Sequence, residues 1–184
     1  MLNSRQASMV SALVAVGAVT RIALGQLALG VPSPFYGIMI KVGLTETLAF
    51  VSGFVFGPVI GFLCGAMIIV TSDLFMIPGP WTPFIAAIVG IFGLAGAMIR
   101  RFRQEPSTLT LGASAVLFTV LSELLQNSWF ALFFNLPIVA TLTMGIPSTL
   151  SAIANNTILL TTVGAKTIKL IEKAMPRSLN ATSA

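Results

Sequence analysis

The sequence is poor in the side chains on which many enzymes depend. Its 184 residues include no histidine and a single cysteine, Cys64. Serine–histidine catalysis, cysteine–histidine catalysis, a Cys/His zinc site and a disulfide within the chain are therefore excluded. The GxxxxGK(S/T) phosphate-binding loop is also absent, so the chain does not itself carry a Walker A motif. These absences argue against most classes of enzyme, and we expect no catalytic residue, metal or cofactor.

Charge is scarce as well. Charged residues make up 8% of the chain and hydrophobic residues 56%, and the mean hydropathy is +0.99. A soluble core does not need so much apolar side chain, so the composition indicates an integral membrane protein. A membrane span takes about 20 apolar residues, which leaves room for roughly six spans with short connections. We predict an all-α membrane protein, a six-transmembrane-helix bundle that forms one domain over residues 1–184.

Glycine and proline divide the apolar sequence into segments. Residues 25–34 and 72–80 are predicted loops, and Gly57 and Pro58 form a tight turn. The stretch 138–146 is apolar but too short to span, so we expect an interfacial lid or the bent start of the last helix. An amphipathic helix with lysines on one face follows the last span. The predicted spans are residues 8–23, 36–54, 58–71, 83–99, 109–130 and 147–162.

The basic residues predict the orientation. With six spans, both termini lie on the same side, which the positive-inside tendency identifies as the cytoplasm. We expect a multi-pass protein of a prokaryotic plasma membrane, in contact with lipid. The net charge of +5 is explained in this way, and no basic run is interleaved with exposed aromatics, so nucleic acid is not an expected partner. Eight of the ten basic residues fall on this side: Arg5, Arg100, Arg101, Arg103, Lys166, Lys169, Lys173 and Arg177.

Polar side chains at membrane depth gather toward the opposite, outer side. Each costs free energy unless it is paired or hydrated, so each needs a reason. One interpretation is hydrogen bonding between helices, with Glu46 or Glu123 paired to Arg21 or Lys41. The other is a polar pocket open to the outside, which we favour because polar groups on two spans share one level. The predicted substrate-binding residues are Arg21, Lys41, Asp73, Trp81, Glu123, Asn127, Trp129, Ser151 and Asn155.

Within such a pocket the residue types suggest roles. A ligand ring would stack on Trp81 or Trp129. The carboxylates of Asp73 and Glu123 would accept hydrogen bonds, while Arg21 or Lys41 would meet an anionic group. The ligand's net charge stays open at this point.

Small residues repeat at helical spacing in three spans. Ser8, Ala12 and Ala15 form one face, which either packs inside the bundle or docks a partner subunit. Residues 57, 61 and 65 are glycines spaced by four, and these predict a packing face. A further stripe, in the fourth span, consists of Ala86, Gly90, Gly93 and Ala97.

Three features follow one another along the chain. They are the Ala/Ser face of the first span, GFVFGPVIG at 53–61 with Gly65 and Asp73, and GPWTPF at 79–84 leading through Gly90, Gly93 and Gly96 to Arg100 and Arg101. Together with the length and the six-span plan, this set resembles the substrate-binding S components of energy-coupling factor (ECF) vitamin transporters. The resemblance covers nearly the whole chain.

The resemblance implies a non-enzymatic subunit that binds a vitamin or precursor near the outer face. It implies a transmembrane T component and two ATPase subunits as partners, with Ser8, Ala12 and Ala15 facing the T component. Pocket residues vary with the ligand in this family, so the list above rests on depth and polarity alone. The alternative is a polytopic membrane enzyme acting on a lipid or isoprenoid, although Glu46, Asp73 and Glu123 form no paired-carboxylate motif. A scaffolding protein would explain the small-residue faces but not the outer polar cluster.

Overall fold

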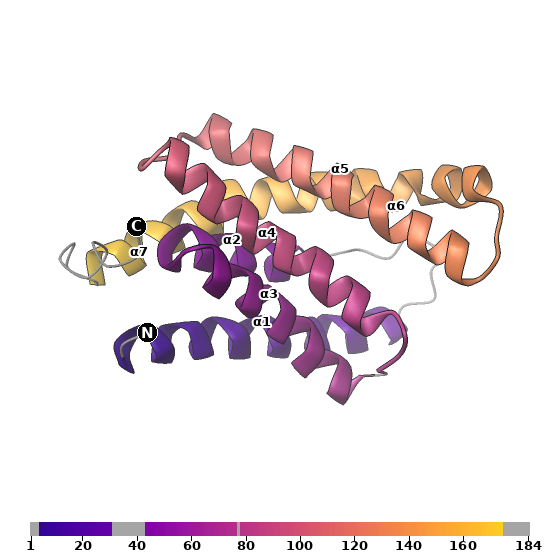
Figure 1. Cartoon of the computed structure of the whole chain (residues 1–184), viewed down its shortest axis with the longest axis horizontal. Coiled ribbons are helices and arrows are strands. Elements are labelled where there is room, and N and C mark those ends of the chain that lie inside the picture. Colours follow the sequence, from indigo (N-terminus) through magenta and orange to yellow (C-terminus); the bar gives the residue numbers. More distant parts are fainter. Residues whose placement is uncertain (1–3, 31–42, 77, 175–184) are drawn as a thin grey trace.

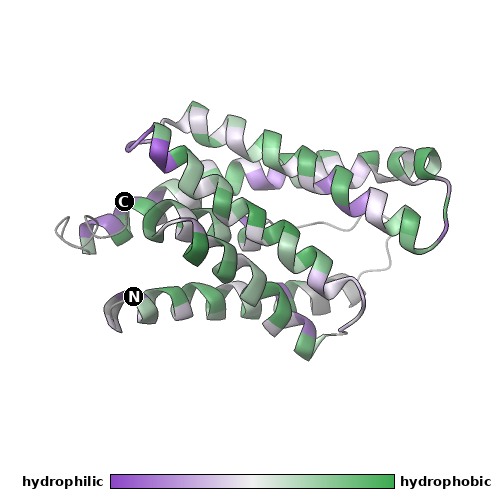
Figure 2. Ribbon diagram, in the orientation of Figure 1, coloured by the Kyte–Doolittle hydropathy of each residue, from purple (hydrophilic) through white to green (hydrophobic). Residues whose placement is uncertain are grey.

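The computed structural model describes residues 4–30, 43–76 and 78–174, and every regular element in these ranges is a helix. The long helices run side by side along one axis (Figure 1). Hydrophobic residues predominate along most of their length (Figure 2). The elements are α1 Ser4–Gly30, α2 Leu44–Phe56, α3 Pro58–Phe75, α4 Thr82–Phe102, α5 Thr108–Phe133, α6 Ile138–Leu159, the π-helix η1 Leu160–Gly164 and α7 Ala165–Ala174.

Five of the described helical stretches are long and apolar enough to cross a membrane: residues Gln6–Leu24, Pro58–Phe75, Thr82–Phe102, Thr108–Phe133 and Ile138–Ala174. Apolar side chains such as Val59, Leu109 and Met144 point outward and are mostly exposed. A surface of this kind suits a lipid environment, so the chain has the features of a multi-pass membrane protein. The described part of α2 has 13 residues, and the first residues of the predicted span 36–54 lie outside the described ranges.

The turns and helix termini gather at two opposite ends of the bundle. The turn between α3 and α4, the turn between α5 and α6 and the end of α1 lie at one end of the bundle, which we call the hollow end (Figure 1). The start of α1, the end of α4 and α7 lie at the other, which we call the basic end because Arg100, Arg101 and Lys173 belong to it. The connections from α2 to α3, α3 to α4, α4 to α5 and α5 to α6 are short, and these helices run in alternating directions (Figure 1).

Helices α2, α3 and α4 touch through backbone atoms at three glycines. A Cβ atom added to Gly53 would lie 1.7 Å from the carbonyl oxygen of Gly93, and one added to Gly93 would lie 2.1 Å from the carbonyl of Gly61. This confirms the predicted packing role of Gly61 and of the α4 stripe. Gly57 differs, because nothing lies within 4 Å of its Cβ position and its φ is +98°. It is the turn residue rather than a member of the packing face.

Helix α1 packs against α2 and α3 on one side only. Gly17 lies against Ile68, and Ala18 is buried. By contrast, Ser8, Ala12 and Ala15 are exposed. Packing inside the bundle therefore does not explain that small-residue face. Cys64 is buried in the cluster that α1 covers, as expected of a small core residue.

Residues 138–146 form the first turns of the last helix, α6, which is one of the two predicted interpretations. The alternative interpretation as a lid is wrong, and Pro147 lies inside the helix. The hydroxyls of Ser148 and Thr149 both donate to the carbonyl of Gly145 at 2.9 Å, beside the proline. Helical hydrogen bonding continues through η1 into α7.

At the basic end, α7 is amphipathic as predicted. Ile168 is buried in the core formed with Phe50 and Phe54, whereas Lys166, Lys169 and Lys173 are exposed. Glu172 forms an ion pair with Arg100, and the Arg100 guanidinium lies 4.9 Å from the centre of the Phe54 ring. These contacts attach α7 to the end of α4 and to α2.

Candidate functional site

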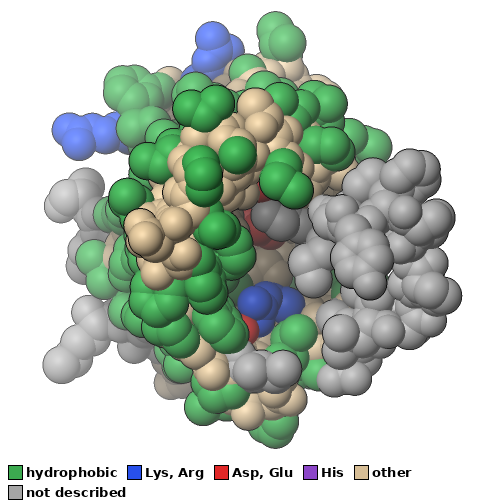
Figure 3. All heavy atoms as spheres, turned by 90° about the vertical axis from the view of Figure 1, so that its right-hand side faces the viewer, with side chains coloured by type: hydrophobic (Ala, Val, Ile, Leu, Met, Phe, Trp, Pro, Cys, Tyr) green, Lys and Arg blue, Asp and Glu red, His purple; other side chains and the backbone are tan. Residues whose placement is uncertain are grey.

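The hollow end is where charged side chains enter the apolar bundle. Viewed from this end, the molecule is hollowed, and both acidic and basic side chains lie in the depression (Figure 3). The helix ends that surround it belong to α1, α3, α4, α5 and α6 (Figure 1). Most of the predicted substrate-binding residues lie on these helices, so the site is described from their contacts.

Arg21 of α1 forms an ion pair with Asp73 near the end of α3. The same guanidinium nitrogen, Nη1, donates to the hydroxyl of Ser72 at 2.5 Å and lies 3.9 Å from the sulfur of Met76. The Ser72 hydroxyl in turn donates to the carbonyl of Ile68 at 2.8 Å. The sequence brings Arg21 and Asp73 together because α1 and α3 run side by side and each carries its charge near the hollow end.

Asp73 also holds the turn between α3 and α4. Its second carboxylate oxygen accepts a hydrogen bond from the Thr82 hydroxyl at 2.6 Å, and the Thr82 oxygen accepts one from the Gly79 backbone N–H at 3.2 Å. Gly79 is needed here because a Cβ atom would lie 2.4 Å from the Trp81 ring. Trp81 is therefore packed against its own turn and half-buried. Asp73 thus joins α1, α3 and the start of α4.

A second polar group lies between α5, α6 and the start of α2. The Asn156 side-chain amide donates to the Thr119 hydroxyl at 2.9 Å, and its oxygen lies where a Cβ of Gly43 would be, 1.2 Å from that position. Glu123, one turn from Thr119 on α5, is buried. Among the described residues, the Asn156 amide nitrogen is satisfied by Thr119, whereas the Asn156 side-chain oxygen is buried without a hydrogen-bond partner. The hydrogen bond therefore offsets only part of the desolvation cost at this join of three helices.

The other predicted substrate-binding residues on α5 and α6 are half-buried. Asn127 packs on Gly145, because a Cβ there would lie 2.8 Å from the Asn127 amide nitrogen. The Asn155 amide nitrogen is 3.4 Å from the Ser151 hydroxyl. The Asn127–Gly145 contact lies between α5 and α6, and the Asn155–Ser151 contact lies along α6. Amide side chains carry both donors and acceptors, and these two are not deeply enclosed.

Trp129 is engaged by other protein rings. Its ring stacks on Phe84 of α4, with centroids 5.0 Å apart, and on Phe133 of α5, with centroids 4.9 Å apart. Phe133 and Phe134 continue the series toward the α5–α6 turn. Trp129 therefore joins α4 to α5 at this end, and a ligand ring would have to join or displace an existing stack. Sequence reasoning did not identify Phe84 as its partner.

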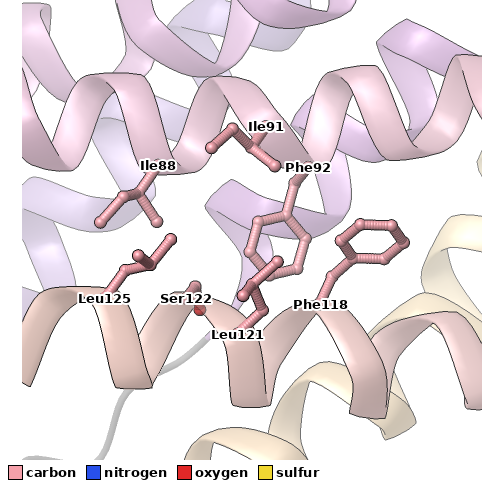
Figure 4. Close-up of a pocket in the computed structure, with 7 residues that line it drawn as sticks. All are labelled: Ile88, Ile91, Phe92, Phe118, Leu121, Ser122 and Leu125. Carbon is pink, nitrogen blue, oxygen red and sulfur yellow. The ribbon is translucent and has the colours of Figure 1, made fainter.

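A separate gap lies between α4 and α5, halfway along the bundle. It is lined by Ile88, Ile91, Phe92, Phe118, Leu121, Ser122 and Leu125, whose side chains point toward one another across the space (Figure 4). Its one polar group, the Ser122 hydroxyl, donates to the carbonyl of Thr119 at 2.9 Å. An apolar gap with its hydroxyl already used does not suit a water-soluble ligand.

The structure therefore pairs Arg21 with Asp73, whereas the sequence had suggested a glutamate as the partner. It places Trp81 in the turn before α4, Asn127 and Trp129 in the last two turns of α5, and Ser151 and Asn155 in the second half of α6. Glu123 is buried in α5. Lys41, the remaining predicted residue, lies outside the described residues. Sequence reasoning missed the contributions of Ser72 and Thr82. The available signal was the position of Thr82 at the start of a helix, shortly after an intramembrane aspartate.

Comparisons of this chain with protein families, with curated proteins and with solved structures find no match.

Proposed function

We propose that this chain is the substrate-binding subunit of an ECF-type importer and takes up a vitamin or related small water-soluble micronutrient. In this proposal the hollow end faces the outside of a prokaryotic plasma membrane and the basic end faces the cytoplasm. The chain crosses the membrane six times, and both termini are cytoplasmic. The subunit performs no covalent chemistry.

The observation that supports this proposal most strongly is the uneven distribution of charge in an apolar bundle. Arg21, Asp73 and Glu123 lie on helices that surround the hollow, and Asp73 and Glu123 are almost fully buried. At the other end, Arg101 and Lys169 are exposed. Charged and amide groups around a depression in a membrane protein are typical of a site for a polar solute. A membrane enzyme is less well supported, since Asp73 is held by Arg21 and Thr82 rather than left available for proton transfer.

The exposed face of α1 supports the expected partners. Ser8, Ala12 and Ala15 point away from α2 and α3 and present small side chains along the helix. In a membrane, small residues let another helix approach closely. We propose that the T component packs here and couples the subunit to two ATPase subunits.

The direct test is native mass spectrometry of the protein purified in detergent, followed by release and identification of small molecules. The proposal predicts one vitamin-like molecule per chain, released on unfolding. Chemical conversion of a lipid or isoprenoid by the isolated chain would contradict it, and so would the absence of any bound solute from protein purified from its own cells.

A further inference from the structure

Arg21 has an asymmetric set of contacts. All the contacts that it makes with described residues use one nitrogen, Nη1, which meets Ser72, Asp73 and Met76. A guanidinium carries five N–H donors in a rigid planar fork. The edge formed by Nε and Nη2 therefore lies opposite the contacts with α3. This edge has the geometry that binds a carboxylate or phosphate through two parallel hydrogen bonds.

The two members of the ion pair differ in exposure. The Arg21 side chain is 26% exposed, whereas the Asp73 side chain is 3% exposed. A molecule entering the hollow can therefore reach the guanidinium but not the carboxylate. Asp73 is also occupied on both oxygens, by Arg21 on one and by Thr82 on the other. Because the Asp73 carboxylate is also buried, the pair presents the donors of Arg21 to a ligand rather than the acceptors of Asp73.

The surroundings prepare Arg21 for this role. An isolated arginine within an apolar bundle would be costly, and Asp73 offsets this cost by neutralising it. Ser72 and Asp73 also fix the position of the guanidinium, because both lie on the same turn of α3 and both accept from Nη1. A donor that is held in place before the ligand arrives loses little conformational entropy on binding.

From these observations we infer that the ligand carries an anionic group, a carboxylate or a phosphate, and that the Nε–Nη2 edge of Arg21 binds it. This inference rests on the proposed function, since it names the chemical class of the solute that the hollow captures. Asp73 and Ser72 are positioning residues that hold Arg21. The sequence alone left Asp73 as a possible acceptor for the ligand, and its burial now removes it from that role.

The test compares ring fragments that differ in charge, added to the detergent-solubilised full chain: benzoate, phenyl phosphate, neutral benzamide and cationic benzylamine. Binding is measured as a shift in the thermal unfolding midpoint and as a change in tryptophan fluorescence. We expect benzoate or phenyl phosphate to bind and benzamide and benzylamine to bind at least about tenfold more weakly. The two anions also decide between a carboxylate and a phosphate.

The variants Arg21→Gln and Arg21→Lys then test the residue. We expect Arg21→Gln to lose the preference for anions, while Arg21→Lys keeps the preference with weaker binding because a lysine cannot form the planar fork. The matched control is Arg101→Gln at the basic end, which should bind as the unmodified chain does. If Arg21→Gln does not fold, the lysine variant and the fragment series on the unmodified chain still decide the question.

Three results would overturn the inference: benzamide or benzylamine binding as tightly as the anions, no fragment binding at all, or unchanged anion binding in both Arg21 variants. These failures are distinct from a failure of the proposed function. A cationic or uncharged solute found in the native protein would remove the anionic group but leave the binding subunit in place, whereas a protein that carries no solute would count against the binding subunit itself.

Discussion

The glycine contact at the centre of α2, α3 and α4 allows a quantitative prediction. In Gly93→Ala, the new Cβ atom would lie 2.1 Å from both the carbonyl carbon and the carbonyl oxygen of Gly61. Carbon atoms in contact lie about 3.5–4.0 Å apart, so the two helices must separate by roughly 1 Å or more. The clash involves backbone on the opposing helix, which cannot rotate away as a flexible side chain would.

Such a separation loosens the packing on both sides of the contact. Adding a methyl group to a filled core costs about 1–3 kcal/mol. Alanine favours the helix over glycine by about 1 kcal/mol, which offsets part of this cost. The net expectation for Gly93→Ala is a loss of up to about 2 kcal/mol, and a larger residue should prevent folding.

Gly112→Ala on α5 is the matched control. Its added Cβ atom would meet only the methyl groups of Thr161 and Thr157, at 3.7 and 3.8 Å, which is ordinary contact. This variant keeps the helix-propensity gain without the clash, so it should be as stable as the unmodified chain or more stable by up to about 1 kcal/mol. Thermal or chemical unfolding in one detergent, followed by circular dichroism, measures both variants. Equal stability of Gly93→Ala and Gly112→Ala would refute the close approach of α3 and α4.

Three further predictions concern the site and the outer face. Asp73→Asn should lower the free energy of unfolding in detergent by about 1–3 kcal/mol, because it leaves the Arg21 charge unpaired. Thr82→Val should lower it less, because it removes one neutral donor. An equal effect of both changes would argue against a structural ion pair. Asn156→Leu should destabilise the chain by about 1–3 kcal/mol, since it removes a buried hydrogen bond to α5, and a fully stable variant would show that this contact contributes nothing. Replacing Ala12 and Ala15 together by leucine should leave the fold and solute binding unchanged but prevent co-purification with the partner subunits. Normal assembly of this double variant would show that the α1 face is not the docking surface.

Hydropathy and small-residue spacing were enough to predict most of the helices. The span at 83–99 lies within α4, and the span at 109–130 lies within α5. Both are long apolar runs with clear boundaries, and there the signal is strongest. The glycine faces were also readable, because a glycine at every third or fourth position leaves few alternatives to close helix contact. Gly57 was predicted both as a turn residue with Pro58 and as a member of the packing face, and only the turn is confirmed. Spacing alone does not distinguish a packing glycine from a turn glycine.

The start of the last helix was harder to predict. Pro147 suggested a boundary because proline removes a helical hydrogen bond, and the preceding apolar stretch was too short to span by itself. In the structure the two stretches join, and hydroxyl groups next to the proline bond to nearby carbonyls. For predicting where a membrane helix begins, the apolar pattern on both sides of a proline is therefore a better guide than the proline itself.

The partner of Arg21 could not be predicted from the sequence. The depth of a residue in the membrane does not determine which neighbouring helix its side chain faces. Glu46, Asp73 and Glu123 all lie at levels that an arginine could reach. Only the packing of α1 on α3 selects Asp73, and that packing depends on Gly17 lying against Ile68. The choice has consequences for the ligand. If Arg21 were paired with an exposed carboxylate, a ligand could contact both the guanidinium and the carboxylate. Because Asp73 is buried, only the hydrogen-bond donors of Arg21 are accessible. The small residue at position 17 thus influences the charge that the hollow presents, although it lies outside the hollow itself.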